Sequence, residues 1–414
     1  MLDPLIIVRA VHIAATAVTA GAIFFELVIA SPMLFAGTGG GSADGYVDGL
    51  KRLIWANLAI ALASGLGWAL LIAARIDGAS IVQALGDGTF LIMLNETRFG
   101  HVWAIRVGLA GLIAAALLLR PRGARWLCLV GAVLFLTALA LVGHAGARPG
   151  EIGWLQFGAD VTHLLAAGAW LGSLPALALL LASGSGVPPE LCTAVTRRFS
   201  TFGVTIVAIL LASGVINAWT QTDSLAALTA TTYGQLLLLK TALFAAMTGL
   251  AATNRWYWMP KLPAARPIRM IRRVSLTEAG LGLVVILVVG ALGMLPPPIH
   301  QHMHENIANE AAFVHIHDVV AMADVSAIPG RVGASEISFR LMSEDFSPLP
   351  AQTVTVTLSH PNGTRLSRQA SPGPDGIWRV LGVPLSAAGT WTVAIDAMSA
   401  GKRIGLDGPL VIEP

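Results

Sequence analysis

The residues best suited to metal chemistry in this sequence lie near the middle of the chain, on either side of a short polar segment. His144 follows one apolar run, and Asp160 and His163 stand near the start of the next. The spacing of Asp160 and His163 predicts that they share one face of a helix. Imidazole nitrogen binds copper, zinc and iron, and a carboxylate can bind the same ion or orient the histidine.

Other polar side chains fall at a similar depth in neighbouring apolar runs. His12 lies about nine residues into the first run, a rise of roughly 13 Å, and His163 has a comparable depth. Ionisable groups at membrane depth are costly and usually line a site, so we predict one outer metal site. Its predicted ligands are His12, His144, Asp160 and His163. Structural or positioning roles are assigned to Arg9, Arg106, Asn217 and Lys240. For each histidine alone, a hydrogen bond between helices remains an open alternative.

Composition and hydropathy indicate the elements that position these residues. The chain has 414 residues, of which 55% are hydrophobic and 12% charged, and so little charge excludes a soluble protein of this size. Apolar runs long enough to cross ~30 Å of hydrocarbon recur through the first three-quarters of the chain. Eight membrane helices are predicted, at about 5–30, 53–75, 101–120, 125–147, 155–182, 199–220, 233–253 and 274–295.

Lysine and arginine predict the orientation of these helices. Alternate connections are rich in them, beginning with Lys51 and Arg52, whereas the remaining connections hold only Arg75, Arg98 and Arg148. The positive-inside rule places the rich connections in the cytoplasm, so both termini face the periplasm or exterior. Because these basic residues lie between membrane helices, no nucleic-acid partner is expected. No basic segment precedes the first apolar run, so we expect that helix to be retained.

Four further residues are assigned no chemistry. Cys128 lies in an apolar run and Cys192 in a predicted cytoplasmic loop, and two cysteines form neither a disulfide framework nor a metal motif. Glu26 and Glu278 lie near predicted cytoplasmic helix ends and are expected to be structural. A short surface helix is predicted at IVQALG, between the second and third membrane helices.

A second set of candidate ligands follows the last apolar run, in the segment HQHMHENIANEAAFVHIH. Residues two apart in an extended chain face the same side, so each HxH pair can clamp one ion. A mixed histidine and methionine shell is the predicted site, and a solvated linker with incidental histidines is the alternative. The candidate ligands are His302, Met303, His304, His315, His317 and Met322.

From about Val319 onward, short alternating runs are separated by turn residues such as the PNG at 361–363. About seven strands in roughly a hundred residues predict an antiparallel β-sandwich. The predicted fold class is therefore a polytopic α-helical membrane bundle followed by a small all-β, Ig-like sandwich. The predicted boundaries are a membrane domain at 1–298, a His/Met-rich linker at 299–318 and a periplasmic β-sandwich at 319–414.

A series of motifs resembles the copper resistance protein D family of bacterial inner-membrane proteins. In chain order they are GHA, DVTHLLAAGAWLGSLP, RRFSTFGV, SGVINAW, TTYGQLLLLKTALF, AATNR, RRVSLTEAGLG and LGMLPPP. The tail looks like the β-sandwich fused to such membrane domains, distantly similar to the periplasmic copper-binding CopC module. That module uses an N-terminal amine, which a fused domain lacks, so Cu(I) is favoured over Cu(II).

The resemblance implies copper transport across the cytoplasmic membrane, in the direction of import, and no enzymatic reaction. It implies membrane ligands at His12, His144 and His163, and tail ligands at His315, His317 and Met322. A periplasmic copper chaperone is a candidate partner, beside copper itself and the lipid bilayer. Two alternatives stay open: a haem-binding redox protein that uses paired histidines, and an outer copper-binding protein that delivers the metal without transporting it.

Overall fold

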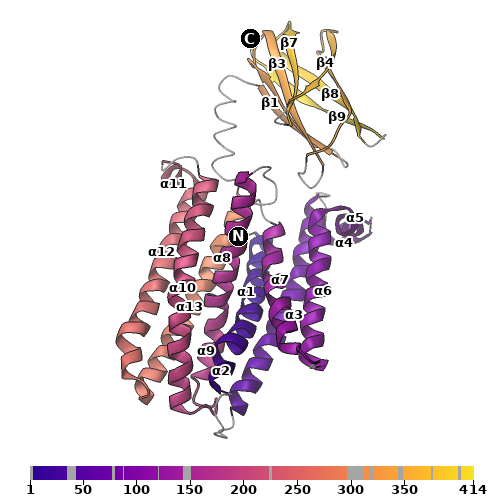
Figure 1. Cartoon of the computed structure of the whole chain (residues 1–414). Coiled ribbons are helices and arrows are strands. Elements are labelled where there is room, and N and C mark those ends of the chain that lie inside the picture. Colours follow the sequence, from indigo (N-terminus) through magenta and orange to yellow (C-terminus); the bar gives the residue numbers. More distant parts are fainter. Residues whose placement is uncertain are drawn as a thin grey trace. The chain divides into compact units, whose positions relative to one another are not determined.

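A computed structural model of the chain forms two compact units, Met1–Pro298 and Ile299–Pro414 (Figure 1). Each unit has its own hydrophobic core. The structure describes all residues except 1–2, 35–42, 77–79, 87, 120, 143–150, 223–225, 296–311, 318–320, 344–347, 374–375 and 400–401.

Eight helical segments of the first unit are long and apolar enough to cross a membrane, which confirms the predicted helical bundle. Four of them are Pro4–Leu34 (α1, Pro4–Phe24, with η1, Phe25–Ala30, and α2, Ser31–Leu34), α3 (Asp44–Ile76), α6 (Arg98–Leu119) and α7 (Ala124–Thr137) with η2 (Ala138–Val142). The other four are α8 (Glu151–Trp170) with η4 (Leu171–Ser173) and α9 (Leu174–Leu180), α10 (Pro189–Gln221), α12 (Thr232–Thr253) with η5 (Asn254–Trp258) and η6 (Met259–Lys261), and α13 (Ala265–Leu292). Three short helices lie in connections: α4 (Ile81–Gly86), which covers the predicted IVQALG, α5 (Thr89–Glu96) and α11 (Ala227–Ala230).

Three membrane helices begin well before their apolar runs. Helices α3, α10 and α13 start at Asp44, Pro189 and Ala265, and each takes in basic residues that the sequence pattern placed in loops. Hydropathy marks the part of a helix that can lie in lipid, whereas the helix itself continues on polar residues beyond that part. The loop position predicted for Cys192 is therefore wrong, because Cys192 lies buried on α10.

Helix α1 begins at a capped end. Asp3 accepts a hydrogen bond from the Leu5 backbone N–H at 2.9 Å, Pro4 is the first helical residue, and the Asp3 carboxylate also pairs with Arg75 of α3. The backbone bond from Leu5, followed by the contact with Arg75, lowers the pKa of Asp3 below its ordinary value. The cap and the ion pair together join the N-terminal end of α1 to the C-terminal end of α3.

The Asp3 cap predicts a small acid-dependent loss of stability. A carboxyl group with a lower pKa in the folded than in the unfolded chain contributes stability above its unfolded pKa, which is about 3.9 for aspartate. That contribution is lost as the pH falls through the folded value. We expect Asp3→Asn to flatten the decline in thermal stability below about pH 4, whereas the matched control Asp48→Asn leaves it unchanged. Equal declines in wild type and Asp3→Asn would contradict the assignment.

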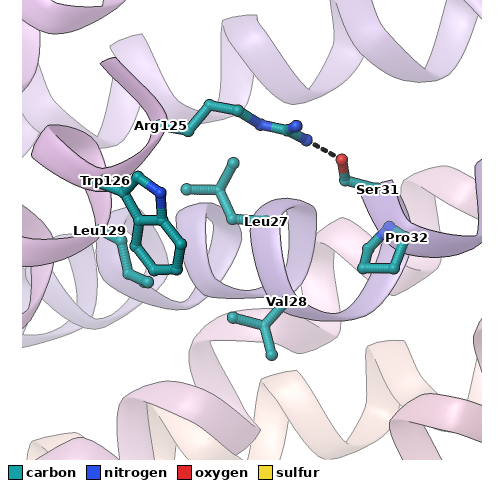
Figure 2. Close-up of a pocket in the computed structure, with 7 residues that line it drawn as sticks. All are labelled: Leu27, Val28, Ser31, Pro32, Arg125, Trp126 and Leu129. Atoms are coloured by element: carbon teal, nitrogen blue, oxygen red, sulfur yellow. Dashed lines mark hydrogen bonds between the residues drawn. The ribbon is translucent and has the colours of Figure 1, made fainter. Parts of the chain in front are cut away.

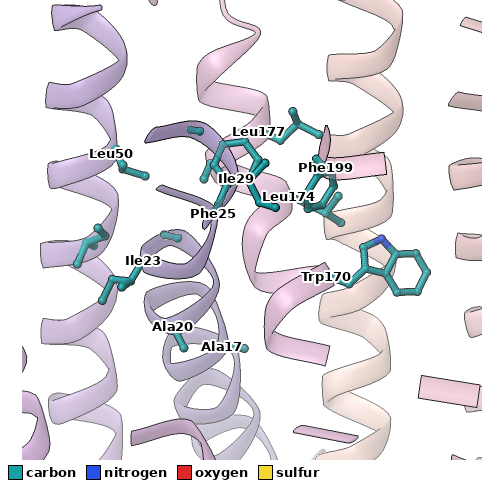
Figure 3. Packing of buried hydrophobic residues seen from close by; sticks show 14 of the residues in the cluster. Ala17, Ala20, Ile23, Phe25, Ile29, Leu50, Trp170, Leu174, Leu177 and Phe199 are labelled. Carbon is teal, nitrogen blue, oxygen red and sulfur yellow. The ribbon is translucent and has the colours of Figure 1, made fainter. Parts of the chain in front are cut away.

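The first and fifth membrane spans touch through glycine. A Cβ atom on Gly21 would overlap the Gly168 carbonyl oxygen and the Gly172 backbone, and one on Gly172 would overlap the Ala17 carbonyl oxygen. Small residues allow two helix backbones to approach this closely. Large apolar side chains from η1, α3, α9 and α10 belong to one buried cluster, as Figure 3 shows for Phe25, Ile29, Leu50, Leu174, Leu177 and Phe199.

Alanine at Gly172 is expected to destabilise the bundle. The added methyl group meets backbone atoms, which cannot move aside as a flexible side chain can, and overpacking of this kind costs about 1–3 kcal/mol. The expected result is a lower melting temperature of the purified protein in detergent. Gly158→Ala is the matched control in the same membrane span, because nothing lies within 4 Å of a Cβ atom there. Equal melting temperatures for the two variants would rule out the close contact.

The second unit is a β-sandwich of two antiparallel sheets, as predicted, with strand orders β1-β2-β3-β7-β6 and β5-β4-β8-β9. Inward-facing residues of both sheets form one core around Phe339 and Trp391. The strands are β1 (Ala312–His317), β2 (Ala321–Ile328), β3 (Gly333–Ser343), β4 (Thr353–Ser359), β5 (Arg365–Gln369), β6 (Ser371–Pro372), β7 (Trp378–Leu385), β8 (Gly389–Ser399) and β9 (Lys402–Ile412).

The sandwich differs from the prediction at its start. Strand β1 lies inside the segment assigned to the His/Met-rich linker and pairs with β2 along its whole length. The sheet therefore begins before Val319, and His315 and His317 belong to the folded domain. The reason is apolar burial: Ile316 is buried in the same core cluster as Val325 and Leu406.

Candidate metal site

Asp160 and His163 both face α10. His163 Nδ1 lies 3.0 Å from the Ser213 hydroxyl oxygen, and the Asn217 side chain lies within hydrogen-bonding reach of the Asp160 carboxylate. Ser213 and Asn217 are four residues apart on α10, so the two pairs stack along the seam between α8 and α10. The predicted shared face of Asp160 and His163 is confirmed by these contacts.

The hydrogen bonds of Ser213 determine which nitrogen of His163 is free. The Ser213 hydroxyl donates to the Ile209 carbonyl oxygen at 2.7 Å, so its oxygen accepts the proton carried by His163 Nδ1. The lone pair then remains on Nε2, to which no residue in the described part of the chain donates a hydrogen bond. Metal-binding histidines are commonly held in this way, with one nitrogen bonded to the protein and the other directed at the ion.

Helix α12 brings a cation to Asp160. Lys240 lies close enough to attract the carboxylate, and Tyr233 of the same helix lies near Asp160 while its hydroxyl donates to Gln221. We call Asp160, His163, Ser213, Asn217 and Lys240 the α8–α10–α12 cluster. Because Asp160 already has a neighbouring positive charge, a metal ion that approaches it competes with the Lys240 ammonium group.

His12 lies in a different arrangement, in which both ring nitrogens are bonded. Its Nδ1 donates to the Ala61 carbonyl oxygen at 2.8 Å, and its Nε2 accepts from Arg106 at 2.8 Å. Arg106 also donates to the Thr16 hydroxyl at 2.9 Å and to the Phe135 carbonyl oxygen. His12 is only 4% exposed. Its lone pair is therefore occupied, and His12 can bind a metal only after the Arg106 guanidinium moves away.

Arg9 bonds to the backbone rather than to a carboxylate. It donates to the Gly293 carbonyl oxygen at 3.0 Å, and its guanidinium lies 5.3 Å from the centre of the Trp68 ring. The Trp68 ring in turn meets the edge of the His12 ring. Arg9 thus joins α1, α3 and the end of α13, which favours the structural role expected for it.

In the β-sandwich, the candidate ligands lie on β1 and β2. His315 is exposed and its Nδ1 lies 2.6 Å from the Asp324 carboxylate, which is opposite it in the strand register. His317 is opposite Met322 in the same register, and Met322 is opposite Met342 on β3. Met322 is only 1% exposed. A metal ion would therefore reach its sulfur atom only if the covering residues moved.

Several predicted ligands have no described position. His144, His302, Met303 and His304 lie outside the described residues, and for His317 only the backbone is described. Within the described ranges, no three histidine, cysteine or acidic side chains converge on a point that could hold a metal ion. Among the described residues, the membrane cluster thus supplies one free imidazole nitrogen and one carboxylate.

A cavity of about 390 Å³ lies at the other end of α1 (Figure 2). Arg125 donates a hydrogen bond to Ser31 across it. The lining is Leu27, Val28, Ser31, Pro32, Arg125, Trp126 and Leu129. A guanidinium and apolar side chains are not copper ligands, so this cavity does not fit the predicted chemistry.

Two residues with a clear part in these sites were not identified from the sequence. Ser213 holds His163, and Asp324 holds His315. Ser213 could have been found from its spacing, since it stands four residues before Asn217 on one helix face. No local pattern predicts the pairing of Asp324 with His315, because it depends on the register between β1 and β2.

Two known proteins similar to this chain have names that refer to copper, and a third is named as an inner membrane protein. The family model described as Copper resistance protein D matches residues 193–292, and the model described as Copper resistance protein D-like, N-terminal domain matches residues 1–154. Copper resistance protein D of Pseudomonas syringae pv. tomato is 31% identical over 286 residues, covering 65% of this chain and 91% of that protein. Copper transport protein CutJ of Bacillus subtilis (strain 168) is 25% identical over 411 residues, covering 94% and 71%.

A third relative, Inner membrane protein YebZ of Escherichia coli (strain K12), is 30% identical over 204 residues, covering 49% of this chain and 70% of that protein. No solved structure matches the chain. The alignments with the first two relatives therefore extend over most of each of those proteins, and CutJ is matched along almost the whole of this chain.

Proposed function

This chain belongs to the copper resistance protein D family, and from that premise we propose that it imports copper ions across the cytoplasmic membrane. Both termini face the periplasm, as the distribution of lysine and arginine indicates. Copper is the transported substrate, with Cu(I) favoured because histidine and methionine side chains are the available ligands. The name of the relative CutJ, a copper transport protein, supports this proposal.

The observation that carries the proposal is the state of His163. Its Nδ1 is held by Ser213 and its Nε2 lone pair is left free, beside the carboxylate of Asp160 and inside a helix bundle. A neutral imidazole fixed in this tautomer is ready to bind a metal without reorganisation. His144 and, after Arg106 has moved, His12 are proposed as further ligands of the same outer site.

The outer segments capture copper before it enters the membrane. His302, Met303 and His304 form one capture point, and His315 and His317 form another on the β-sandwich, which Met322 joins only after the residues that cover it have moved. Asp324 orients His315 there. Each point offers a few ligands of moderate strength, so copper can pass by ligand exchange, and a periplasmic copper chaperone is a candidate donor.

Lys240 keeps the outer site from retaining its ion. The ammonium group and the metal compete for Asp160, so the carboxylate has a positive neighbour both before and after the ion passes. A transport site must bind strongly enough for entry and weakly enough for release. A tethered cation beside the carboxylate meets both requirements.

Transport is tested with the purified full chain in liposomes that contain a copper-responsive dye. We expect copper to enter these vesicles faster than protein-free vesicles, and an external chelator to stop the entry. Copper bound to the protein without entry would contradict transport and favour the delivery function. An absorption spectrum without a Soret band is expected, because Arg106 occupies the His12 lone pair that a bis-histidine haem would need.

A further inference from the structure

Three residues from separate sequence motifs meet inside the helix bundle, away from the α8–α10–α12 cluster. Glu278 of α13 is 2% exposed, and the Asn254 amide nitrogen at the start of η5 lies 3.4 Å from its carboxylate. The Trp170 indole N–H at the end of α8 lies within hydrogen-bonding reach of the same carboxylate. Asn254 is 9% exposed. Trp170 stands ten residues beyond Asp160 on α8, roughly 15 Å along the helix axis.

No positive charge in the described part of the chain pairs with Glu278. Helix α13 packs against α12, η5, η6, α1, η4 and α9. The last two contain no ionisable residue. The basic groups of the other four elements are engaged elsewhere: Lys240 with Asp160, Arg255 with Ser200, Lys261 with Tyr257, Arg9 with Gly293 and His12 with Arg106. The Tyr233 hydroxyl of α12 donates to Gln221, and on α13 itself Arg272 donates to the Ala178 carbonyl oxygen. The remaining basic residues of α13, Arg266, Arg269 and Arg273, lie on its first turns, on the N-terminal side of Glu278.

A buried carboxylate that has only neutral donors is costly. Removing an ion from water costs several kcal/mol, and two uncharged N–H groups offset only part of that. Binding a proton removes the charge and with it most of the cost. A metal ion would need more oxygen or nitrogen ligands than one carboxylate and one amide provide. The chemistry of the pocket therefore favours a proton as its ligand.

The Asn254 carboxamide can form a hydrogen bond with Glu278 both when the carboxyl group is ionised and when it is protonated. Its oxygen Oδ1 is buried and has no hydrogen-bond partner among the described residues, so no hydrogen bond of that oxygen has to break when the amide group rotates. With the NH2 group toward Glu278 it donates to the carboxylate, and after a turn its oxygen accepts the O–H of the protonated acid. The two orientations have almost the same shape. The Trp170 N–H can donate to a carboxyl oxygen in both states.

We propose that Glu278 is a reversible proton-binding site. When the proton binds, the side-chain amide of Asn254 rotates so that its oxygen faces Glu278. The proton is transferred from a hydronium ion of the surrounding water: one O–H bond of hydronium breaks, which leaves a water molecule, and one O–H bond forms on a carboxylate oxygen. No other covalent bond changes. Asn254 begins a π-helical segment, a type of segment that frequently occurs at functional sites. The proposal goes beyond copper transport, and it stands whether or not copper crosses the membrane.

Infrared spectroscopy of the purified full chain tests the proposal directly. We expect a C=O stretching band of a protonated carboxylic acid at neutral pH, which shifts in D2O, disappears on alkaline titration and is lost in Glu278→Gln. Glu26→Gln is the matched control, since Glu26 is a carboxyl group in the same bundle that is bonded to Tyr46, and it should leave the Glu278 band unchanged.

Two milder variants keep the test independent of how well Glu278→Gln folds. Asn254→Leu has almost the same size but no amide, and Trp170→Phe keeps a ring without the N–H. Each should move the frequency of the band, because each removes one hydrogen-bond partner of the carboxyl group. Spectra of Glu278→Gln identical to wild type, or a band insensitive to both milder variants, would overturn the assignment. Failure of copper transport in liposomes would leave these infrared results unaffected.

Discussion

Alanine at His163 is expected to abolish copper-dependent accumulation in cells that produce the protein. The substitution removes the only imidazole nitrogen in the described helices that is both oriented by a neighbour and free to bind an ion. The fold should survive, because the Ser213 hydroxyl keeps its hydrogen bond to the Ile209 carbonyl oxygen. Cellular copper is measured by mass spectrometry and normalised to the amount of protein in the membrane.

His101→Ala is the matched control for this measurement. His101 also lies on a membrane helix, but its side chain is exposed on α6 and belongs to neither polar cluster. We expect the control to accumulate copper as the wild type does. Accumulation by His163→Ala at the wild-type level, with equal protein, would show that copper does not pass this histidine.

Leucine at Arg106 is expected to destabilise the bundle by several kcal/mol. Arg106 donates to His12 Nε2, the Thr16 hydroxyl and the Phe135 carbonyl oxygen, and it is buried. Without Arg106, three buried acceptors lose their hydrogen-bond donor. A buried acceptor without a donor costs about 1–3 kcal/mol. The melting temperature of the purified protein in detergent should therefore fall more than for Gly172→Ala.

Two further variants separate this network from a general effect of lost charge. Arg122→Gln removes an exposed arginine and should leave the melting temperature unchanged. His12→Leu combined with Arg106→Leu should cost less than the sum of the two single changes, because both partners of one hydrogen bond are removed together. Additive losses, or an Arg106→Leu variant as stable as the wild type, would contradict the network.

The membrane helices could be predicted from the sequence because lipid imposes a minimum apolar length. Their first residues could not, since a helix can begin on polar residues before the apolar run, such as those around Arg197 in α10. The same limit explains the wrong placement of Cys192, which lies on this extension. Hydropathy measures what can lie in lipid, and it contains no signal for where backbone hydrogen bonding stops.

The strands of the sandwich were predictable where alternate side chains are apolar, as in TVTVTLS, which forms β4. Strand β5 has the sequence RLSRQ and lies at a sheet edge with four of its five residues exposed, so it lacks that alternation. Strand β1 was assigned to the linker because its histidines suggested metal binding. The burial of Ile316 between His315 and His317 decides its fold.

The candidate site was predictable only in part. The three-residue spacing of Asp160 and His163 indicates a shared helix face, since that relation is local. The occupied lone pair of His12 depends on Arg106, which is 94 residues away in the chain and reaches it only through tertiary packing. The sequence positions of both histidines could therefore identify them as candidate ligands. They could not distinguish the hydrogen-bonded imidazole of His12 from the free imidazole nitrogen of His163.

The central claim is that copper binds within the membrane bundle at His163, and anomalous X-ray scattering from copper-loaded crystals of the full chain tests it most directly. A copper peak is predicted about 2.0–2.1 Å from His163 Nε2, the distance usual for a metal bound to imidazole. This peak should be absent from crystals of His163→Ala that retain copper on the β-sandwich. Copper peaks confined to the β-sandwich in the wild-type protein would contradict the account.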